Sequence, residues 1–180
     1  APNLPPVDLM LTRLHFANNQ VAAGKALLEQ VAIDHADHPE VYLLFGNIAL
    51  NEGRITDALL HFERSMQRAP PEDWTNNQKL ALMRESYNGQ AAVAERREDW
   101  YRAQVALTQL TKILPTDAGI RDRLGSALFM LGREDDALIQ VRTSARLDSN
   151  MNTAEVSMAV MHLRAGDTEE AVKQFQAAAR

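Results

Sequence analysis

The 180-residue sequence contains no cysteine, which excludes disulfide bonds and thiolate chemistry. Aromatic residues make up only 6% of it. Its longest apolar runs, such as Val41 to Phe45, fall far below the roughly 20 residues that a membrane-spanning helix needs. We therefore expect a soluble protein that does not insert into a membrane. These absences favour a cytoplasmic protein, and a bacterial protein tethered to the envelope is the alternative.

The sequence also lacks an excess of positive charge. Its net charge is −5, whereas a nucleic-acid partner requires a basic patch large enough to displace counterions from phosphates. With 46% hydrophobic and 24% charged residues, the composition is that of a globular domain or an elongated repeat array. We therefore expect no nucleic-acid partner.

Motifs of catalytic and cofactor sites are missing as well. The sequence has no Walker loop, no dinucleotide glycine fingerprint, no H-E-x-x-H and no G-x-S-x-G nucleophile elbow. Asp34, His35, Asp37 and His38 form one metal-like cluster, but such spacing is common, and we interpret this segment as a solvated linker. We expect a protein that is not an enzyme and that uses no metal and no cofactor.

An internal repeat is present. The segment "GNIALNEGRITDALLHF" from Gly46 superposes on "GSALFMLGREDDALIQV" from Gly125, with glycines, alanine and apolar residues in phase. Gly53, Gly132 and Gly166 take the same place in three units, and an alanine follows each of them five residues later. A segment that recurs at a fixed period along the chain is the signature of a repeat architecture.

This pattern resembles the tetratricopeptide repeat, a pair of antiparallel helices with the signature W-x-x-L-G-x-x-Y, then A-x-x-x-F, then P. The best unit carries its residues at Tyr42, Phe45, Gly46, Ala49, Ala58, Phe62 and Pro70. The resemblance implies an all-α, right-handed superhelical solenoid that forms a single domain over residues 1–180. Its repeats are predicted at about 5–38, 39–72, 84–117, 118–151 and 152–180.

Gly46 lies within an apolar helical run, where glycine costs about 1 kcal/mol relative to alanine. We interpret it as a packing residue whose missing side chain lets paired helices approach closely. An insertion of 11 residues, 73–83, separates the second and third units. We expect it to lengthen the first helix of the third unit, to about 72–96, either as a helix that packs on the second unit or as a docking or dimerisation element centred on Trp74. Asn76 and Asn77 leave open a break into two helices.

In the family, first helices line a concave groove that holds a peptide or a partner helix. The positions beside the core face predict this groove at Leu43, Asn47, Leu50, Asn88, Ala92, Glu95, Asp122, Ser126 and Phe129. The lysines of the family's carboxylate clamp are absent, so we expect an apolar, polar-edged segment of another protein as the ligand. Alternatively, the apolar members of this set pack against adjacent first helices.

The predicted function is a non-catalytic scaffold for protein–protein interaction. Two alternatives stay open: a regulatory or substrate-presenting segment of a larger enzyme, and a self-assembly module that forms homo-oligomers through the long helix or the C-terminal end. The sequence begins with Ala1 rather than methionine, and Ala171, Phe175 and Ala178 place an apolar stripe on the last helix. We therefore expect a piece of a longer protein, with at least one more helix after Arg180.

Overall fold

The all-α prediction is confirmed by a computed structural model that describes residues 4–179. Ten α-helices and no strand occur in these residues. Arg180, the last residue of the fifth predicted repeat, lies outside them. The helices are α1 (Val7–Ala17), α2 (Val21–Asp34), α3 (Pro39–Asn51), α4 (Ile55–Gln67), α5 (Asn76–Arg96), α6 (Trp100–Ile113), α7 (Ala118–Met130), α8 (Glu134–Leu147), α9 (Ala154–Ala165) and α10 (Thr168–Ala178).

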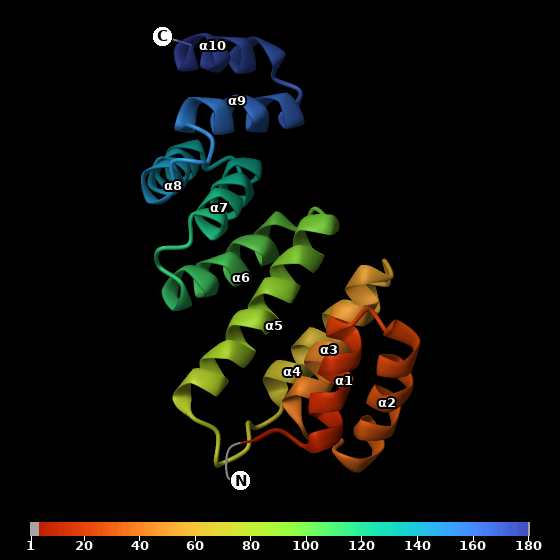
Figure 1. The fold of residues 1–180 in the computed structure, drawn as a ribbon. Coiled ribbons are helices and arrows are strands. Elements are labelled where there is room, and N and C mark those ends of the chain that lie inside the picture. Colours follow the sequence, from red (N-terminus) through yellow and green to blue (C-terminus); the bar gives the residue numbers. More distant parts are fainter. Residues whose placement is uncertain (1–3, 180) are drawn as a thin grey trace. The chain divides into compact units, whose positions relative to one another are not determined.

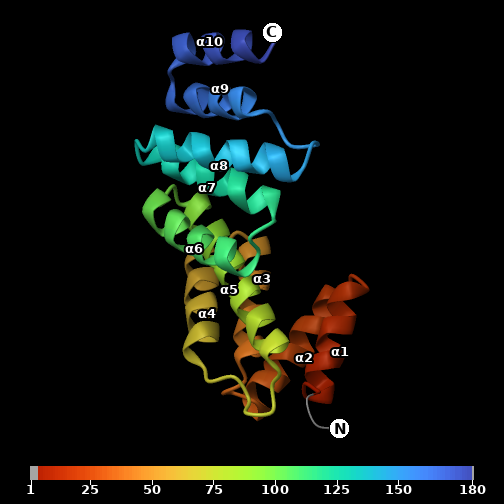
Figure 2. The same cartoon turned by 90° about the vertical axis from the view of Figure 1, so that its left-hand side faces the viewer.

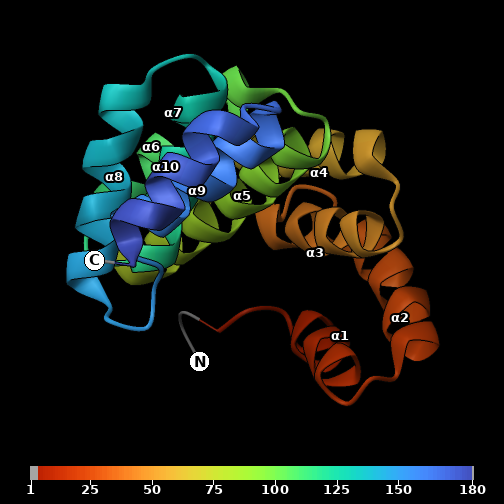
Figure 3. The same cartoon turned by 90° about the horizontal axis from the view of Figure 1, so that it is seen from above.

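Contacts divide the chain into two compact units, residues 1–93 and 94–180, with the boundary inside α5. In the first unit α1 pairs with α2 and α3 pairs with α4 (Figure 1), and α3 lies between α2 and α4 (Figure 3). In the second unit α7 pairs with α8 and α9 pairs with α10, and these four helices stack in chain order (Figure 2). Each unit is thus built from antiparallel helix pairs, as the repeat predicted.

The turns between paired helices share one backbone conformation. The three predicted turn glycines have φ of +74°, +74° and +84° at Gly53, Gly132 and Gly166, the left-handed region that glycine adopts without strain. Asn19 and Glu98 occupy the same position in the other two turns, with φ of +58° and +55°. Each of these residues comes two positions before the first residue of a second helix. All five turns therefore follow one geometry, although only three of them contain glycine.

The packing role predicted for Gly46 is confirmed, and its partner is an aromatic ring. A Cβ atom on Gly46 would lie 2.7 Å from Cε1 of Phe62, and one on Gly89 would lie 2.3 Å from Cζ of the same ring. Phe62 projects from α4 and is fully buried. Glycines on α3 and α5 thus leave the space that the ring fills. Ser65 and Ser86 add a buried hydrogen bond of 2.6 Å between α4 and α5.

The long helix α5 begins at Asn76, four residues later than predicted. Thr75 explains this start, because its Oγ1 accepts a hydrogen bond from the backbone N–H of Gln78 at 3.3 Å. In return the Gln78 side chain accepts the N–H of Thr75 at 2.8 Å, which completes a capping box. Asn76 and Asn77 open the helix and do not break it. Since Leu82 and Val93 belong to the same apolar cluster as Phe62, the helix packs on the second repeat, as the first alternative held.

The docking role predicted for Trp74 does not fit its position. Trp74 is only 6% exposed and belongs to the apolar cluster that contains Leu43, Phe62 and Leu82. Its ring meets the His38 ring edge-on, with 5.6 Å between centroids. The segment before α5 therefore returns the indole to the core instead of presenting it to a partner.

We predict that Gly89→Ala lowers the free energy of unfolding. The new methyl group would overlap the ring of Phe62, which is fully buried. Overpacking of this kind costs about 1–3 kcal/mol, which outweighs the gain of up to about 1 kcal/mol that alanine has over glycine within a helix. Urea denaturation of the variant and the parent measures the difference.

Gly119→Ala is the matched control, because a Cβ atom there meets only a carboxylate oxygen of Asp117, at 3.4 Å. We expect this variant to be as stable as the parent or more stable. A Gly89→Ala variant with unchanged stability would contradict the close fit of Phe62 against α5.

We predict that Glu98→Gly raises the free energy of unfolding by about 0.5–1 kcal/mol, because a left-handed conformation costs a non-glycine residue about 1 kcal/mol or more. Glu98→Ala keeps that cost and is expected to show no such gain. Equal stabilities of the glycine and alanine variants in urea denaturation would refute the strain at this turn.

A third prediction concerns His38 beside Trp74. Burial, together with the neighbouring His35 and Arg13, lowers the pKa of His38 from 6.5 to about 4, and burial is the largest of these causes. The unfolded chain therefore binds a proton more readily, so the stabilising contribution of neutral His38 is complete above pH 6.5 and is lost as the pH falls from 6.5 toward 4. We expect His38→Gln to lose less stability than the parent over this interval.

The contribution of Glu40 to stability changes with pH in the opposite direction. Burial raises the pKa of its carboxyl group, although the Arg13 guanidinium, 2.7 Å from Oε1, opposes this shift. The protonated form is thus favoured by folding, and its contribution to stability is lost as the pH rises above 4.5. For this reason the comparison is made between chains that both retain Glu40. Parallel stability curves for the parent and His38→Gln between pH 4 and 6.5 would contradict the assignment to His38.

Candidate functional sites

Residues 4–179 contain neither a candidate membrane-spanning helix nor a candidate metal-binding group. None of the described helices combines the length and apolar character needed to cross a membrane. The described residues also contain no group of three or more histidine, aspartate or glutamate side chains placed to hold a metal ion. His38 of the metal-like segment instead packs against Trp74. The candidate sites are therefore cavities between helices.

The first cavity, called here the Asn47 cavity, lies in the first unit and has a volume of about 370 Å³. Its walls come from the α1–α2 turn, the start of α2 and the second half of α3. Four apolar, three amide and two charged side chains line it: Phe16, Val21, Leu44, Ile48, Asn19, Asn47, Asn51, Lys25 and Glu52. Phe16, Leu44 and Ile48 also pack against the buried cluster of α1, α2 and α3, so the cavity opens at the edge of a core.

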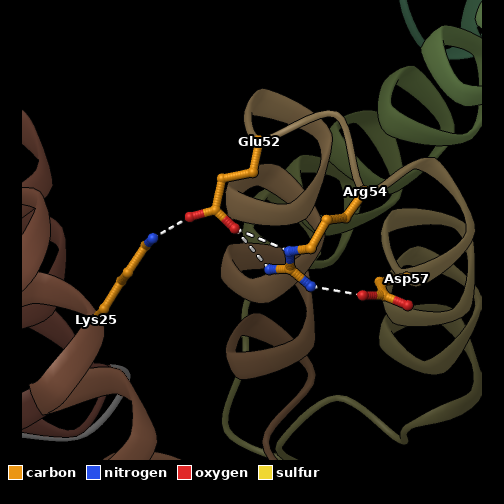
Figure 4. A network of polar contacts seen from close by, with 4 residues as sticks. All are labelled: Lys25, Glu52, Arg54 and Asp57. Atoms are coloured by element: carbon orange, nitrogen blue, oxygen red, sulfur yellow. Dashed lines mark hydrogen bonds and ion pairs between the residues drawn. The ribbon is translucent and has the colours of Figure 1, made fainter.

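A chain of ion pairs fixes the charged edge of this cavity (Figure 4). Lys25 of α2 donates to Oε1 of Glu52, and Arg54 donates to Oε2 of Glu52 at 2.9 Å. Arg54 also donates to Asp57 at 2.6 Å. The hydrogen bonds from Lys25 and then from Arg54 lower the pKa of Glu52. Both charged groups that line the cavity are therefore neutralised by protein partners.

The second cavity, called here the Trp100 cavity, lies in the second unit and has a volume of about 320 Å³. It lies between the α5–α6 turn, the start of α6, and the helices α7 and α9. Three large apolar side chains and three polar ones line it: Trp100, Met130, Met161, Glu98, Ser126 and Arg164. Met161 is buried, whereas Glu98 and Arg164 are exposed.

The two cavities occupy equivalent places in the repeat. Each is lined by the left-handed turn residue of one helix pair, Asn19 or Glu98, and by the first residue of its second helix, Val21 or Trp100. Each also takes residues from the following first helix at one and five positions after the signature glycine. These residues are Asn47 and Asn51 in the first cavity, and Ser126 and Met130 in the second. The same position of the repeat thus forms a cavity in two different helix pairs, and the two cavities differ in the side chains that line them.

The structure places the predicted groove residues in three different settings. Leu43 and Phe129 are each 6% exposed and pack in the interior. Asn47 and Asn88 are exposed. The half-buried members of the set are Leu50, Ala92, Glu95, Asp122 and Ser126. Asn47 and Ser126 line the two cavities, and a binding role for these exposed and half-buried residues stays a prediction.

Two of these residues connect neighbouring elements of the second unit. Arg123 of α7 donates through two guanidinium nitrogens to the carboxylate of Glu95, each at 2.9 Å. Asp122 accepts a hydrogen bond from Ser157 of α9 at 3.1 Å. Glu95 and Asp122 therefore help to hold the first helices in register, and their carboxylates are engaged within the protein.

Sequence reasoning missed most of the cavity lining. Asn51, Met130 and Arg164 each lie five residues after a small signature residue, Gly46, Gly125 and Ala159. The predicted groove residues lie three before, one after and four after the small residue, so this offset is not among them. Trp100, the first residue of α6, is half-buried. The common offset of five residues is the signal that would have located both cavities.

Comparison with known proteins agrees with this architecture. Residues 9–73 match the family model described as tetratricopeptide repeat. No curated protein matches the sequence. The structure is similar to MamA from Desulfovibrio magneticus RS-1, with a TM-score of 0.73 and 16% identity over 96% of this chain and 91% of that one.

Two further solved structures have a similar fold. MamA AMB-1 is 23% identical, with a TM-score of 0.71 over 96% of this chain and 95% of that one. YrrB, described as a TPR protein with an unusual peptide-binding site, is 17% identical, with a TM-score of 0.74 over 95% of this chain and 82% of that one. The resemblance found in the sequence is thereby confirmed: residues 9–73 match the tetratricopeptide-repeat model, and the described residues have the fold of tetratricopeptide-repeat proteins.

Proposed function

We propose that the protein is a non-catalytic scaffold that binds an extended segment of a partner protein, with the Asn47 cavity as one of its binding sites. The observation that carries this proposal is the composition of the cavity, in which apolar walls stand beside three amide side chains. Pockets for small ligands span about 300–1,000 Å³, so a cavity near the lower limit suits one side chain of a longer ligand. The description of YrrB as a peptide-binding protein of the same fold gives further support.

The amides favour a ligand that presents its backbone. Asn47 and Asn51 are four residues apart on α3, so their side chains share one face of the helix. Each amide can donate and accept hydrogen bonds at once, which matches the N–H and C=O groups of an extended peptide. The backbone groups of a helical ligand are already paired within the helix. An extended segment with one aliphatic side chain in the cavity is therefore the ligand that we propose for this site.

The test begins with a random peptide library selected against the purified chain. We predict that Asn47→Ala weakens the binding of selected peptides about threefold to tenfold, the effect of losing one or two neutral hydrogen bonds. Because Asn47 is exposed, thermal stability should stay within about 0.5 kcal/mol of the parent. Fluorescence anisotropy of a labelled peptide measures the affinity.

Asn77→Ala is the matched control, since Asn77 is an exposed asparagine at the start of α5 and does not line the cavity. Its affinity should equal that of the parent. If the library yields no binding peptide, the scaffold proposal is wrong. If selected peptides bind Asn47→Ala and the parent equally, the Asn47 cavity is not the site.

A further inference from the structure

The Trp100 cavity holds two opposite charges that do not neutralise each other. Among the described residues neither Glu98 nor Arg164 has a salt-bridge partner within 4.0 Å, although both line the cavity. The contrast with the equivalent Asn47 cavity is direct, because there Lys25 and Glu52 form an ion pair with each other. The second cavity thus keeps an anion and a cation available to a ligand.

The same cavity also has an apolar surface that can adapt to its ligand. Trp100 is half-buried, and Met130 and Met161 contribute flexible thioether side chains. Methionine adjusts its conformation to fill irregular gaps, and an indole ring offers a large rigid contact area. A single aliphatic or aromatic side chain fits such a surface.

The backbone conformation of Glu98 favours a role in ligand binding over a role in stabilising the fold. Its backbone is left-handed, with φ of +55°, at a turn position where three of the five helix pairs have glycine. This conformation is unfavourable for glutamate, and its side chain makes no salt bridge within the described residues that would offset the cost. A strained residue whose charge lines a cavity is a reasonable candidate for ligand contact.

We propose that the Trp100 cavity binds a partner-protein segment in which one acidic and one basic side chain flank a large apolar residue. The apolar residue packs on Trp100, Met130 and Met161. Arg164 binds the ligand carboxylate, for which its planar guanidinium is well shaped. Glu98 binds the ligand cation. This inference rests on the proposed scaffold function and adds the charge pattern of the ligand.

The probes are acetylated, amidated peptides in which one glutamate and one lysine flank a central leucine, in both orders and at spacings of one to three residues. Blocked ends leave the side chains as the only charges. Trp100 reports binding through its fluorescence, and Trp74→Phe removes the signal of the only other tryptophan. Calorimetric titration of the unmodified chain gives the affinity independently, in case the Trp74→Phe variant does not fold.

We expect at least one of these peptides to bind. An analogue in which glutamine replaces both the glutamate and the lysine should bind about tenfold more weakly, because it loses charge-assisted hydrogen bonds. Arg164→Gln should abolish discrimination between glutamate and glutamine in the peptide. Glu98→Gln should abolish discrimination between lysine and glutamine. Arg146→Gln, an exposed arginine of α8 outside the cavity, is the control for net charge and should behave as the parent.

The decisive variant carries Glu98→Lys and Arg164→Glu together. It should retain affinity for the peptide set but prefer the opposite order of charges. Unchanged peptide preference in this variant, or failure of the whole peptide set to bind, would overturn the charge-pair inference. The scaffold function is tested separately, because peptides selected from the random library that bind irrespective of Glu98 and Arg164 would support the scaffold and refute this site.

Discussion

The packing of large side chains against glycine determines how closely paired helices approach. In the first unit the Phe62 ring of α4 fills the space left by Gly46 and Gly89, and the Phe16 ring of α1 fills the space left by Gly24 of α2. In the second unit a Cβ atom on Gly125 would lie 2.8 Å from Cγ1 of Val141. Val141 follows Gly125 by 16 residues, as Phe62 follows Gly46. One pairing rule, a small residue opposite a large one, therefore recurs in both units.

This rule separates the residues that hold the fold from those that can vary. The glycines and their partners lie on the faces that paired helices share, so they are buried and restricted in size. The turn residue, the first residue of the second helix and the positions one and five after the glycine lie away from that contact. Their side chains line the cavities instead. The sequence at these positions can change the ligand chemistry without disturbing the core.

Sequence alone predicted the elements that repeat and missed those that occur once. The helix pairs, the three turn glycines and the burial of Ala58, Ala137 and Ala171 follow from periodicity, because each unit repeats the same contact. The sequence leaves the role of Trp74 open between two alternatives, because this residue belongs to the irregular segment before α5, where no period indicates which way a side chain points. The start of α5 depends on a local capping box of Thr75 and Gln78, a pattern that is readable in the sequence but does not belong to the repeat.

The cavities were harder to predict for a different reason. Trp100, Met130 and Arg164 come from α6, α7 and α9, and only the stacking of those helices brings them together. Periodicity shows which face of a helix is apolar, but not where two stacked pairs fail to fill the space between them. The same limit applies to charge. Lys25 and Glu52 are 27 residues apart and neutralise each other, whereas Glu98 and Arg164 line one cavity without a salt bridge. A repeat position that is identical in backbone geometry therefore differs in electrostatic character because of a few side chains, and this difference is what allows two equivalent cavities to prefer different ligands.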